Sequence, residues 1–357
     1  MSAAHCSIYD GVAHDNYACV DTVINTCYNA SVYKTMKDDT VRNSAYEAAI
    51  SQLQITPGDL WLEIGCGAYL CLTNIAMRAH PEINILAIEA NQSAYDSART
   101  LAEKQNCDKK QLEVRNVRSD KLVEKRVVKV VLSELIGNIA SQEGAAVFLK
   151  RYVNTYQVPR YAATFFAPCS LSNILKNVKP SSDIYNSSSF MVMDTALSKC
   201  NCSNKWAPAE HFDFYTGKYS EQRQEWEFEI AEDGKVDCFG LFVWVGFCNY
   251  QNRDRAFGQQ STSFPYQSAL KFDTVPTHSF SSLQDDSTTA SNWFNVIVKF
   301  PKAVHVSKGQ MLKATSIFNY DKKTTEGKYI PSYSFEVGDQ KFGIPFSHFA
   351  QDYESKS

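Results

Sequence analysis

The fold is decided by the segment Leu60-Trp61-Leu62-Glu63-Ile64-Gly65-Cys66-Gly67. Its first five residues form a short apolar run, which predicts a buried strand, and the glycines predict a turn directly after it. A helix is expected over 70–79, and a second strand over 85–88 ends at Glu89. Strand, glycine turn, helix and strand in this order predict a parallel βαβ unit.

The same alternation continues on both sides of this unit. Helices are expected over 31–56, 93–105 and 144–156, and strands over 112–114 and 127–132. After Pro168 the sequence changes to short aromatic and β-branched runs separated by polar turn residues, which is typical of a β-barrel or sandwich. The predicted fold is α/β, a Rossmann-like doubly wound parallel sheet followed by a β-barrel domain. The predicted domains are an N-terminal extension (1–30), an α/β domain (31–168) and a barrel (169–357), from which the irregular stretch 186–219 is a candidate excursion.

The composition of the chain indicates which kinds of binding partner and which cellular compartment to expect. The chain has 357 residues, of which 44% are hydrophobic and 21% charged, and its net charge of -3 provides no basic field for nucleic acid. No apolar run is long enough to span a membrane. The eleven cysteines are scattered, and the close pair Cys200 and Cys202 lacks a second pair at zinc spacing, so no metal site is expected. These features, and the lack of an apolar leader after Met1, lead us to expect the cytoplasm, with the nucleus as a second location.

The glycine turn and Glu89 predict a nucleotide-type site. In an open parallel sheet, ligands bind at the carboxyl ends of the strands, where the strand order reverses. Gly65 and Gly67 let the backbone pass close to a ligand, and Glu89 can accept hydrogen bonds from both ribose hydroxyls. The same pattern also occurs as an ordinary structural turn. Leu70 stands where a dinucleotide site has its third glycine, which favours S-adenosylmethionine over NAD.

Two further acids follow the predicted strand 127–132. Glu134 comes at its end, and Glu143 follows a loop that contains Gly137 and precedes the predicted helix 144–156. Two carboxylates that converge on one cavity repel each other unless a cation lies between them. A guanidinium is planar and permanently charged, so it fits such a pair. The alternative is a strand-end acid and a helix N-terminal acid with no shared role.

Several motifs, in this order along the chain, resemble those of the protein arginine methyltransferases. The segment 33–46 resembles the helix that covers the cofactor, with the spacing Asp39-x-x-Arg42-x-x-x-Tyr46. The motif at 63–67 resembles the cofactor motif of class I methyltransferases, and 87–91 resembles the ribose-binding strand end. The segment 133–143 resembles the loop that carries two glutamates, and 291–294 resembles the segment with a substrate-facing Trp.

The resemblance implies a function and a set of site residues. Glu134 and Glu143 would hold the guanidinium of an arginine-containing protein or peptide substrate, and Trp293 would face it. S-adenosylmethionine would be the cofactor, with Tyr33 packed across it and Arg42 paired with its carboxylate. Ser119 falls where the family has an adenine-contacting acid, and Asp120 would substitute for it. The implied cofactor-binding residues are Tyr33, Arg42, Glu63, Gly65, Gly67, Glu89, Ser119 and Asp120.

The chain also departs from the family pattern. Tyr69 replaces the usual third glycine, and Thr277-His278 lies well before Trp293, so the Thr-His-Trp loop is not intact. We therefore expect a divergent protein arginine methyltransferase. Two alternatives are a methyltransferase that acts on a small-molecule amine and an inactive scaffold or regulatory subunit. Family members commonly pair through an excursion from the barrel, so the resemblance implies a homodimer through 186–219.

Overall fold

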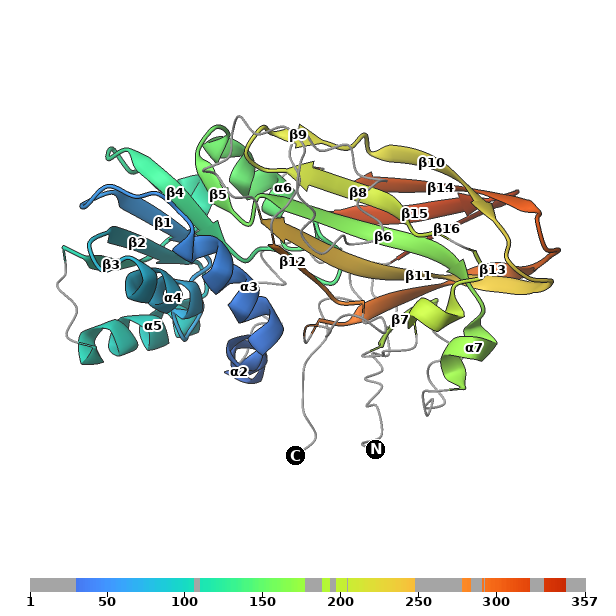
Figure 1. Cartoon of the computed structure of the whole chain (residues 1–357), viewed down its shortest axis with the longest axis horizontal. Helices are drawn as coiled ribbons and strands as arrows, with labels where there is room; N and C mark the ends of the chain where they lie inside the picture. Colours follow the sequence, from blue (N-terminus) through green and yellow to red (C-terminus); the bar gives the residue numbers. More distant parts are fainter. Residues whose placement is uncertain are drawn as a thin grey trace.

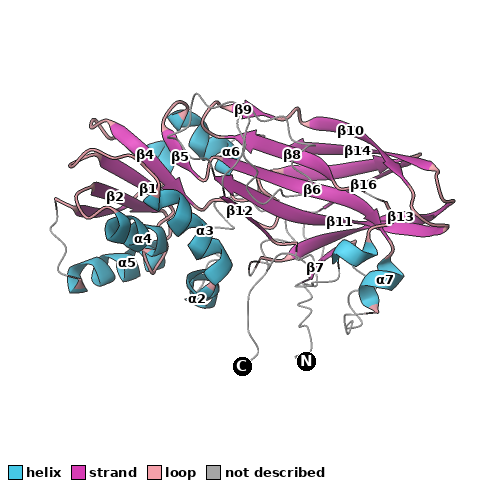
Figure 2. Cartoon of the chain, in the orientation of Figure 1, coloured by secondary structure: helices cyan, strands magenta, loops and turns pink. Residues whose placement is uncertain are grey.

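The structure is a computed structural model with two units (Figure 1). An α/β unit is followed along the chain by a second unit that contains two antiparallel sheets. Figure 2 shows that the second unit consists mainly of strands. The residues that it describes are 30–105, 110–176, 188–192, 197–203, 205–247, 278–283, 291, 293–321 and 331–344. The predicted N-terminal extension, apart from Ala30, lies outside the described residues.

Five parallel strands form the sheet of the α/β unit, in the order β3-β2-β1-β4-β5. They are β1 (Leu60–Ile64), β2 (Asn84–Glu89), β3 (Leu112–Asn116), β4 (Val128–Ser133) and β5 (Tyr156–Val158). Every residue of β1 is buried, which agrees with its mainly apolar sequence, because a central parallel strand is covered on both faces. The strand order reverses between β1 and β4, and this edge is where such sheets bind ligands.

The helices before and between the first strands follow the predicted pattern, except that one predicted helix is divided into two. They are α2 (Ala30–Asp38), α3 (Thr40–Ser51), α4 (Cys71–Ala79) and α5 (Gln92–Lys104), and Figure 1 shows α3, α4 and α5 on one face of the sheet. The single helix predicted over 31–56 is interrupted at Asp39, whose side-chain oxygen accepts a hydrogen bond from the Arg42 amide (3.0 Å) and caps α3. None of the helices in the described residues is long and apolar enough to cross a membrane.

The helix predicted over 144–156 is much shorter in the structure. It consists of α6 (Ala145–Phe148) and a 3-10 turn, η2 (Leu149–Tyr152). The backbone of Asn154 has a left-handed φ of 65°, which ends the helical segment, and β5 begins two residues later. The sequence pattern missed β5 because a three-residue strand carries too little periodicity to be recognised.

The second unit consists of two antiparallel sheets. The larger has the order β7-β13-β11-β6-β8-β9, with β12 paired to β11, and the smaller has the order β10-β14-β15-β16. Rings from both sheets meet in one core, where Phe166 and Phe239 lie 5.5 and 5.1 Å from Phe335 between ring centroids. The predicted fold class, a Rossmann-like sheet followed by a β-barrel, is confirmed. The strands are β6 (Tyr161–Cys169), β7 (Ser189–Val192), β8 (Ala207–Asp213), β9 (Lys218–Tyr219), β10 (Arg223–Glu229), β11 (Gly234–Phe247), β12 (His278–Ser281), β13 (Asn295–Val306), β14 (Met311–Asn319), β15 (Ser332–Val337) and β16 (Gln340–Ile344), with the short helices α7 (Leu171–Leu175) and η4 (Leu197–Cys200) between β6 and β8.

Two segments bear on the predicted domain organisation. Strand β6 pairs with β11 over 161–169, so the barrel begins just after β5 and not at the predicted residue 169. Within 186–219, β7 pairs with β13 and β8 pairs with β6. Strands β7, β8 and β9 of this stretch therefore belong to the large sheet, and the excursion stays a prediction.

The two units share a buried junction. Phe212, Val243 and Phe247 of the barrel pack into the same apolar cluster as Tyr46 and Leu149 of the α/β unit. Beside this cluster, Arg160 forms a buried ion pair with Asp213 (Nη2 to Oδ2, 2.9 Å). The Arg160 guanidinium also lies 4.9 Å from the ring centroids of Tyr161 and Tyr215. The pair thus fixes the first residues of the barrel against β8.

Asp213→Ala should destabilise the protein strongly. It leaves the buried Arg160 guanidinium without its carboxylate, a loss that costs about 3–5 kcal/mol in comparable buried pairs. The matched control is Glu227→Ala, which removes an exposed pair with Lys313 and should cost less than about 1 kcal/mol. Urea unfolding of the three proteins measures both values, and equal losses in the two variants would contradict a special role for the junction pair.

Candidate active site

The register of the parallel sheet brings three candidate residues to one edge. Ile64 pairs with Ile88 on one side and with Ser133 on the other. The residues that follow these three, Gly65, Glu89 and Glu134, therefore leave the sheet at the same level.

A cavity opens at this edge. Its empty space is about 860 Å³, including the part open to solvent. Nine of the residues predicted from the sequence line it: Tyr33, Arg42, Glu63, Gly65, Gly67, Glu89, Ser119, Glu134 and Glu143.

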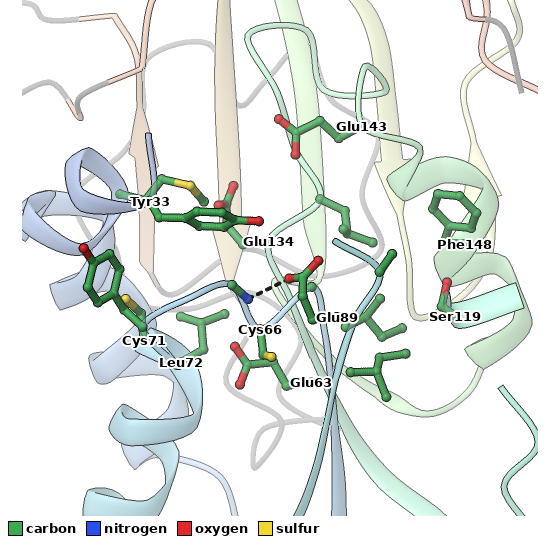
Figure 3. A pocket seen from close by; sticks show the side chains of 18 of the residues that line it. Tyr33, Glu63, Cys66, Cys71, Leu72, Glu89, Ser119, Glu134, Glu143 and Phe148 are labelled. Atoms are coloured by element: carbon green, nitrogen blue, oxygen red, sulfur yellow. Dashed lines mark hydrogen bonds between the residues drawn. The ribbon is translucent and has the colours of Figure 1, made fainter. Parts of the chain in front are cut away.

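The turn after β1 requires glycine. Gly65 and Gly67 have left-handed φ values of 75° and 61°, which other residues rarely adopt. A Cβ on Gly67 would also lie 2.9 Å from the ring of Tyr33, too close for real atoms. The Tyr33 ring from α2 therefore lies directly on the turn, where it covers the cavity (Figure 3).

Glu89 is held rigidly beside this turn. Its Oε2 accepts a hydrogen bond from the Gly67 amide (2.9 Å), drawn as the dashed line in Figure 3, and its Oε1 accepts one from the Asn91 amide (2.8 Å). Burial raises the pKa of Glu89, and these backbone donors oppose the rise. Each carboxylate oxygen has two lone pairs, so both can still accept a further hydrogen bond. The carboxylate therefore fits a pair of ribose hydroxyls.

Glu63 lies beneath the turn, and its carboxyl group differs from that of Glu89 in its protonation. It is fully buried, accepts a hydrogen bond from the Thr73 hydroxyl, and has a pKa that burial raises to about 8. At pH 7 the Glu63 carboxyl is therefore largely protonated, and it can donate as well as accept a hydrogen bond.

Arg42 is the buried cation of the cavity. Its Nη1 donates to Glu134 Oε2 (3.0 Å), and its Nη2 donates to the Met36 carbonyl (2.7 Å) and to Asn43 Oδ1 (3.0 Å). The sequence interpretation gave Arg42 the cofactor carboxylate as its partner, whereas the structure pairs it with Glu134. Burial raises the pKa of Glu134, and the charge of Arg42 opposes the rise.

Glu143 reaches the same cavity from the other end of the loop that starts at Glu134. Figure 3 shows it at the upper end of the cavity, while Ser119 and Phe148 lie on the right. The loop folds tightly at Gly137, where a Cβ would lie 2.5 Å from Gln142 Oε1. The two carboxylates therefore face one space, as the guanidinium hypothesis requires.

The part of the cavity near Ser119 differs from the sequence interpretation. Ser119 is buried and lines the cavity, but Asp120 is exposed and does not line it. Asp120 pairs instead with Arg118 (Nε to Oδ1, 2.6 Å), so the structure does not support its proposed contact with adenine. Arg118 lines the cavity and was missed. The one sequence feature that could have indicated Arg118 as a site residue was its position next to Ser119, after β3.

Trp293 is placed away from the cavity lining. It is half-buried, and its ring lies 5.2 Å from that of Phe280 between centroids. Phe280 in turn contacts Tyr46, whose hydroxyl donates to the Ser133 carbonyl (2.8 Å). The structure thus places Trp293 in the aromatic cluster at the junction, and this contrasts with the predicted substrate-facing role. Thr277 lies outside the described residues.

Comparisons with known proteins place this geometry in a known fold. No family model matches the chain, and no curated protein matches it. Among solved structures, it is similar to Arabidopsis thaliana protein arginine methyltransferase 10, with a TM-score of 0.64 and 16% identity over 88% of this chain and 96% of the other. It is also similar to the Trypanosoma brucei protein arginine methyltransferase 1 enzyme–prozyme complex with AdoHcy (TM-score 0.62, 13% identity, 88% and 98% coverage) and to protein arginine methyltransferase 6 (0.60, 16%, 87% and 100%).

The chain has the protein arginine methyltransferase fold. The matched regions cover almost the whole of each solved chain, so both the α/β unit and the barrel contribute to the likeness. At 13–16% identity this likeness concerns the fold, and the chemistry has to be argued from the cavity itself.

Tyr69, which departs from the glycine of the family pattern that the sequence resembles, makes a specific contact. It lines the cavity, and Lys37 Nζ of α2 lies 5.0 Å from the centroid of its ring. The next residue, Leu70, is buried with a left-handed φ of 51°, so the turn keeps a glycine-like backbone without a third glycine. Lys37 and Tyr33 therefore attach α2 to the turn at two points.

Lys37→Met should loosen α2 because it removes the cation–π contact while it keeps the aliphatic stem. Such contacts contribute about 0.5–1 kcal/mol, which corresponds to roughly a two- to fivefold faster amide exchange in α2. Hydrogen exchange followed by mass spectrometry measures the change, and β14 in the distant small sheet provides the internal reference. Tyr69→Gly should give at least the same increase. Unchanged exchange in both variants would mean that the contact does not hold the helix.

Proposed function

We propose that the chain is an S-adenosylmethionine-dependent N-methyltransferase whose acceptor is the guanidinium of arginine in a protein or peptide. The observation that carries the proposal is the convergence of Glu134 and Glu143 on the cavity that also contains the glycine turn and Glu89. A carboxylate pair suits a planar cation, and a strand-end carboxylate beside glycines suits a nucleoside.

The residues of the cavity fit this cofactor from end to end. Glu89 has free acceptor capacity for the ribose hydroxyls, Gly65 and Gly67 let the backbone approach, and Arg42 provides a buried cation for a carboxylate. The Trypanosoma brucei complex was solved with AdoHcy, and a structure of protein arginine methyltransferase 6 was solved with SAH. S-adenosylmethionine would supply an electrophilic methyl group on its sulfonium.

The two acids would orient the acceptor. Glu134 already binds one guanidinium, that of Arg42, through Oε2, so its other oxygen can contact a second one. With Glu143 on the opposite side, the pair would hold positive charge on the contacted nitrogens and leave the third nitrogen to attack. The guanidinium pKa exceeds about 12, so the proton would leave during or after transfer, to a carboxylate oxygen of the pair.

A second candidate function is that of a subunit with this fold that does not itself transfer methyl groups. The observation that favours it is Tyr69, whose side chain lines the cavity where a glycine would leave space. The solved Trypanosoma brucei complex pairs an enzyme with a prozyme in a heterotetramer. Cofactor binding by the isolated chain distinguishes the two candidates only in part, so transfer has to be measured as well.

Glu89→Ala should weaken S-adenosylmethionine binding at least tenfold, or about 1.4 kcal/mol, because the ribose loses its acceptor and the turn loses its brace. Isothermal titration calorimetry of the wild type and the variant measures this. The control is Glu113→Ala, which removes a carboxylate of the neighbouring strand β3 that pairs with Arg115 outside the cavity. Absence of binding by the wild type would favour the second candidate function.

Glu134→Gln and Glu143→Gln should each reduce methyl transfer to an arginine-rich peptide about 100-fold, because a charge-assisted bond to the guanidinium becomes a neutral one. Cofactor affinity should stay within about threefold for Glu143→Gln. A peptide of the same sequence with lysine in place of arginine should be a poor acceptor, since an ammonium does not bridge two carboxylates in a plane. Full turnover in both variants would exclude the double-acid mechanism, and preference for the lysine peptide would exclude arginine as the acceptor.

A further inference from the structure

The loop between Glu134 and Glu143 is anchored by the barrel. The Ala140 amide donates to Thr164 Oγ1 of β6 (2.8 Å), and the Ser141 amide donates to Glu210 Oε1 of β8 (3.0 Å). The Ser141 hydroxyl also donates to the Tyr333 hydroxyl of β15 (3.3 Å). Three strands from both barrel sheets therefore hold two consecutive residues that lie just before Glu143.

Glu210 is the central anchor of this group. Its side chain is fully buried, and Oε1 accepts hydrogen bonds from both the Ser141 amide and the Thr164 hydroxyl (2.8 Å). Its Oε2 has no hydrogen-bond partner among the described residues. Burying a carboxyl with one unpaired oxygen is costly, and burial raises the pKa of Glu210 to about 7. What this group provides is a buried acceptor at the Ser141 amide, and this hydrogen bond is about twice as strong when the carboxyl is ionised as when it is neutral.

Glu210 and Glu143 are linked through the residues around Ser141. Ser141, which donates through its amide to Glu210 and through its hydroxyl to Tyr333, is two residues before Glu143. Burial raises the pKa of Tyr333, and the charges of Glu210 and Glu143 add to the rise. Glu210 does not line the cavity, whereas Glu143 does. The contact through which Glu210 can position Glu143 is therefore its hydrogen bond to the Ser141 amide.

We propose that Glu210 is a positioning residue, which fixes the backbone at Ser141 and thereby sets the place of Glu143 in the cavity. This inference rests on the proposed function, because it assigns Glu143 a guanidinium to hold. It also makes the barrel part of the catalytic geometry. A displacement of about 1 Å at Glu143 would reduce the rate about 100-fold.

The test compares three variants in the full chain. Glu210→Ala removes the acceptor, whereas Glu210→Gln keeps an oxygen for the Ser141 amide at the same position. Asp237→Ala is the matched control. Asp237 also accepts a backbone hydrogen bond in the barrel, from Leu171 (2.7 Å), and its ion-pair partner is Lys235, which is not in the loop. Where Glu210→Ala does not fold, Thr164→Val replaces it, since it is isosteric and removes the anchor of Ala140.

Hydrogen exchange provides a readout that needs no activity. We expect exchange at Ala140 and Ser141 to rise at least tenfold in Glu210→Ala, less than threefold in Glu210→Gln, and not at all in Asp237→Ala. Thr164→Val should raise exchange at Ala140 by a similar factor. Unchanged exchange in this loop, or a rise spread equally over the whole chain, overturns the proposal.

Kinetics separate this proposal from the proposed function. For arginine-peptide methylation, kcat should fall at least 30-fold in Glu210→Ala and recover to within fivefold in Glu210→Gln, while the Kd for S-adenosylmethionine stays within threefold. Wild-type kcat in a folded Glu210→Ala variant overturns the positioning role and leaves the proposed function intact. If Glu210→Ala loosens the loop but the wild-type protein transfers no methyl group, the anchoring role stands and the proposed function is rejected.

Discussion

Ile64 pairs on one side with Ile88 and on the other with Ser133, so three parallel strands end at one level. Everything in the candidate site depends on this register. A shift of one residue in either pairing would turn the strand-end side chains to the other face of the sheet. The apolar residues of β1, buried on both faces, fix the register, because any shift would expose part of this run to polar surroundings.

The buried pair of Arg42 and Glu134 connects the two halves of the cavity. Loss of either partner would leave a buried charge unpaired, which costs about 3–5 kcal/mol. Under the proposed function, the same guanidinium faces the cofactor carboxylate while Glu134 faces the acceptor. Arg42 therefore limits how far Glu134 can move. The N-cap at Asp39 fixes the first turn of α3 and with it the position of Arg42.

The barrel contributes directly to the structure of the cavity. Its strands share an apolar cluster with the α/β unit, and they anchor the loop that carries Glu143 through Thr164, Glu210 and Tyr333. The α/β unit alone supplies strand ends, glycines and Glu89, which suffice for a nucleoside. The end of the cavity at Glu143, in contrast, takes its shape from backbone groups whose hydrogen-bond partners belong to the barrel.

The sequence by itself determined the strands and helices of the α/β unit, the glycine turn, and the carboxylates at the strand ends, because each depends on neighbours within a few residues. The tertiary structure alone decided that Arg42 pairs with Glu134, 92 residues away, and that Ser141 is held by Glu210, 69 residues away. It also decided that Trp293 lies in the aromatic junction and Asp120 outside the cavity. The physical reason is that hydrogen bonds and ring contacts between distant segments depend on how the sheets pack, and the spacing of residues along the chain contains no such information.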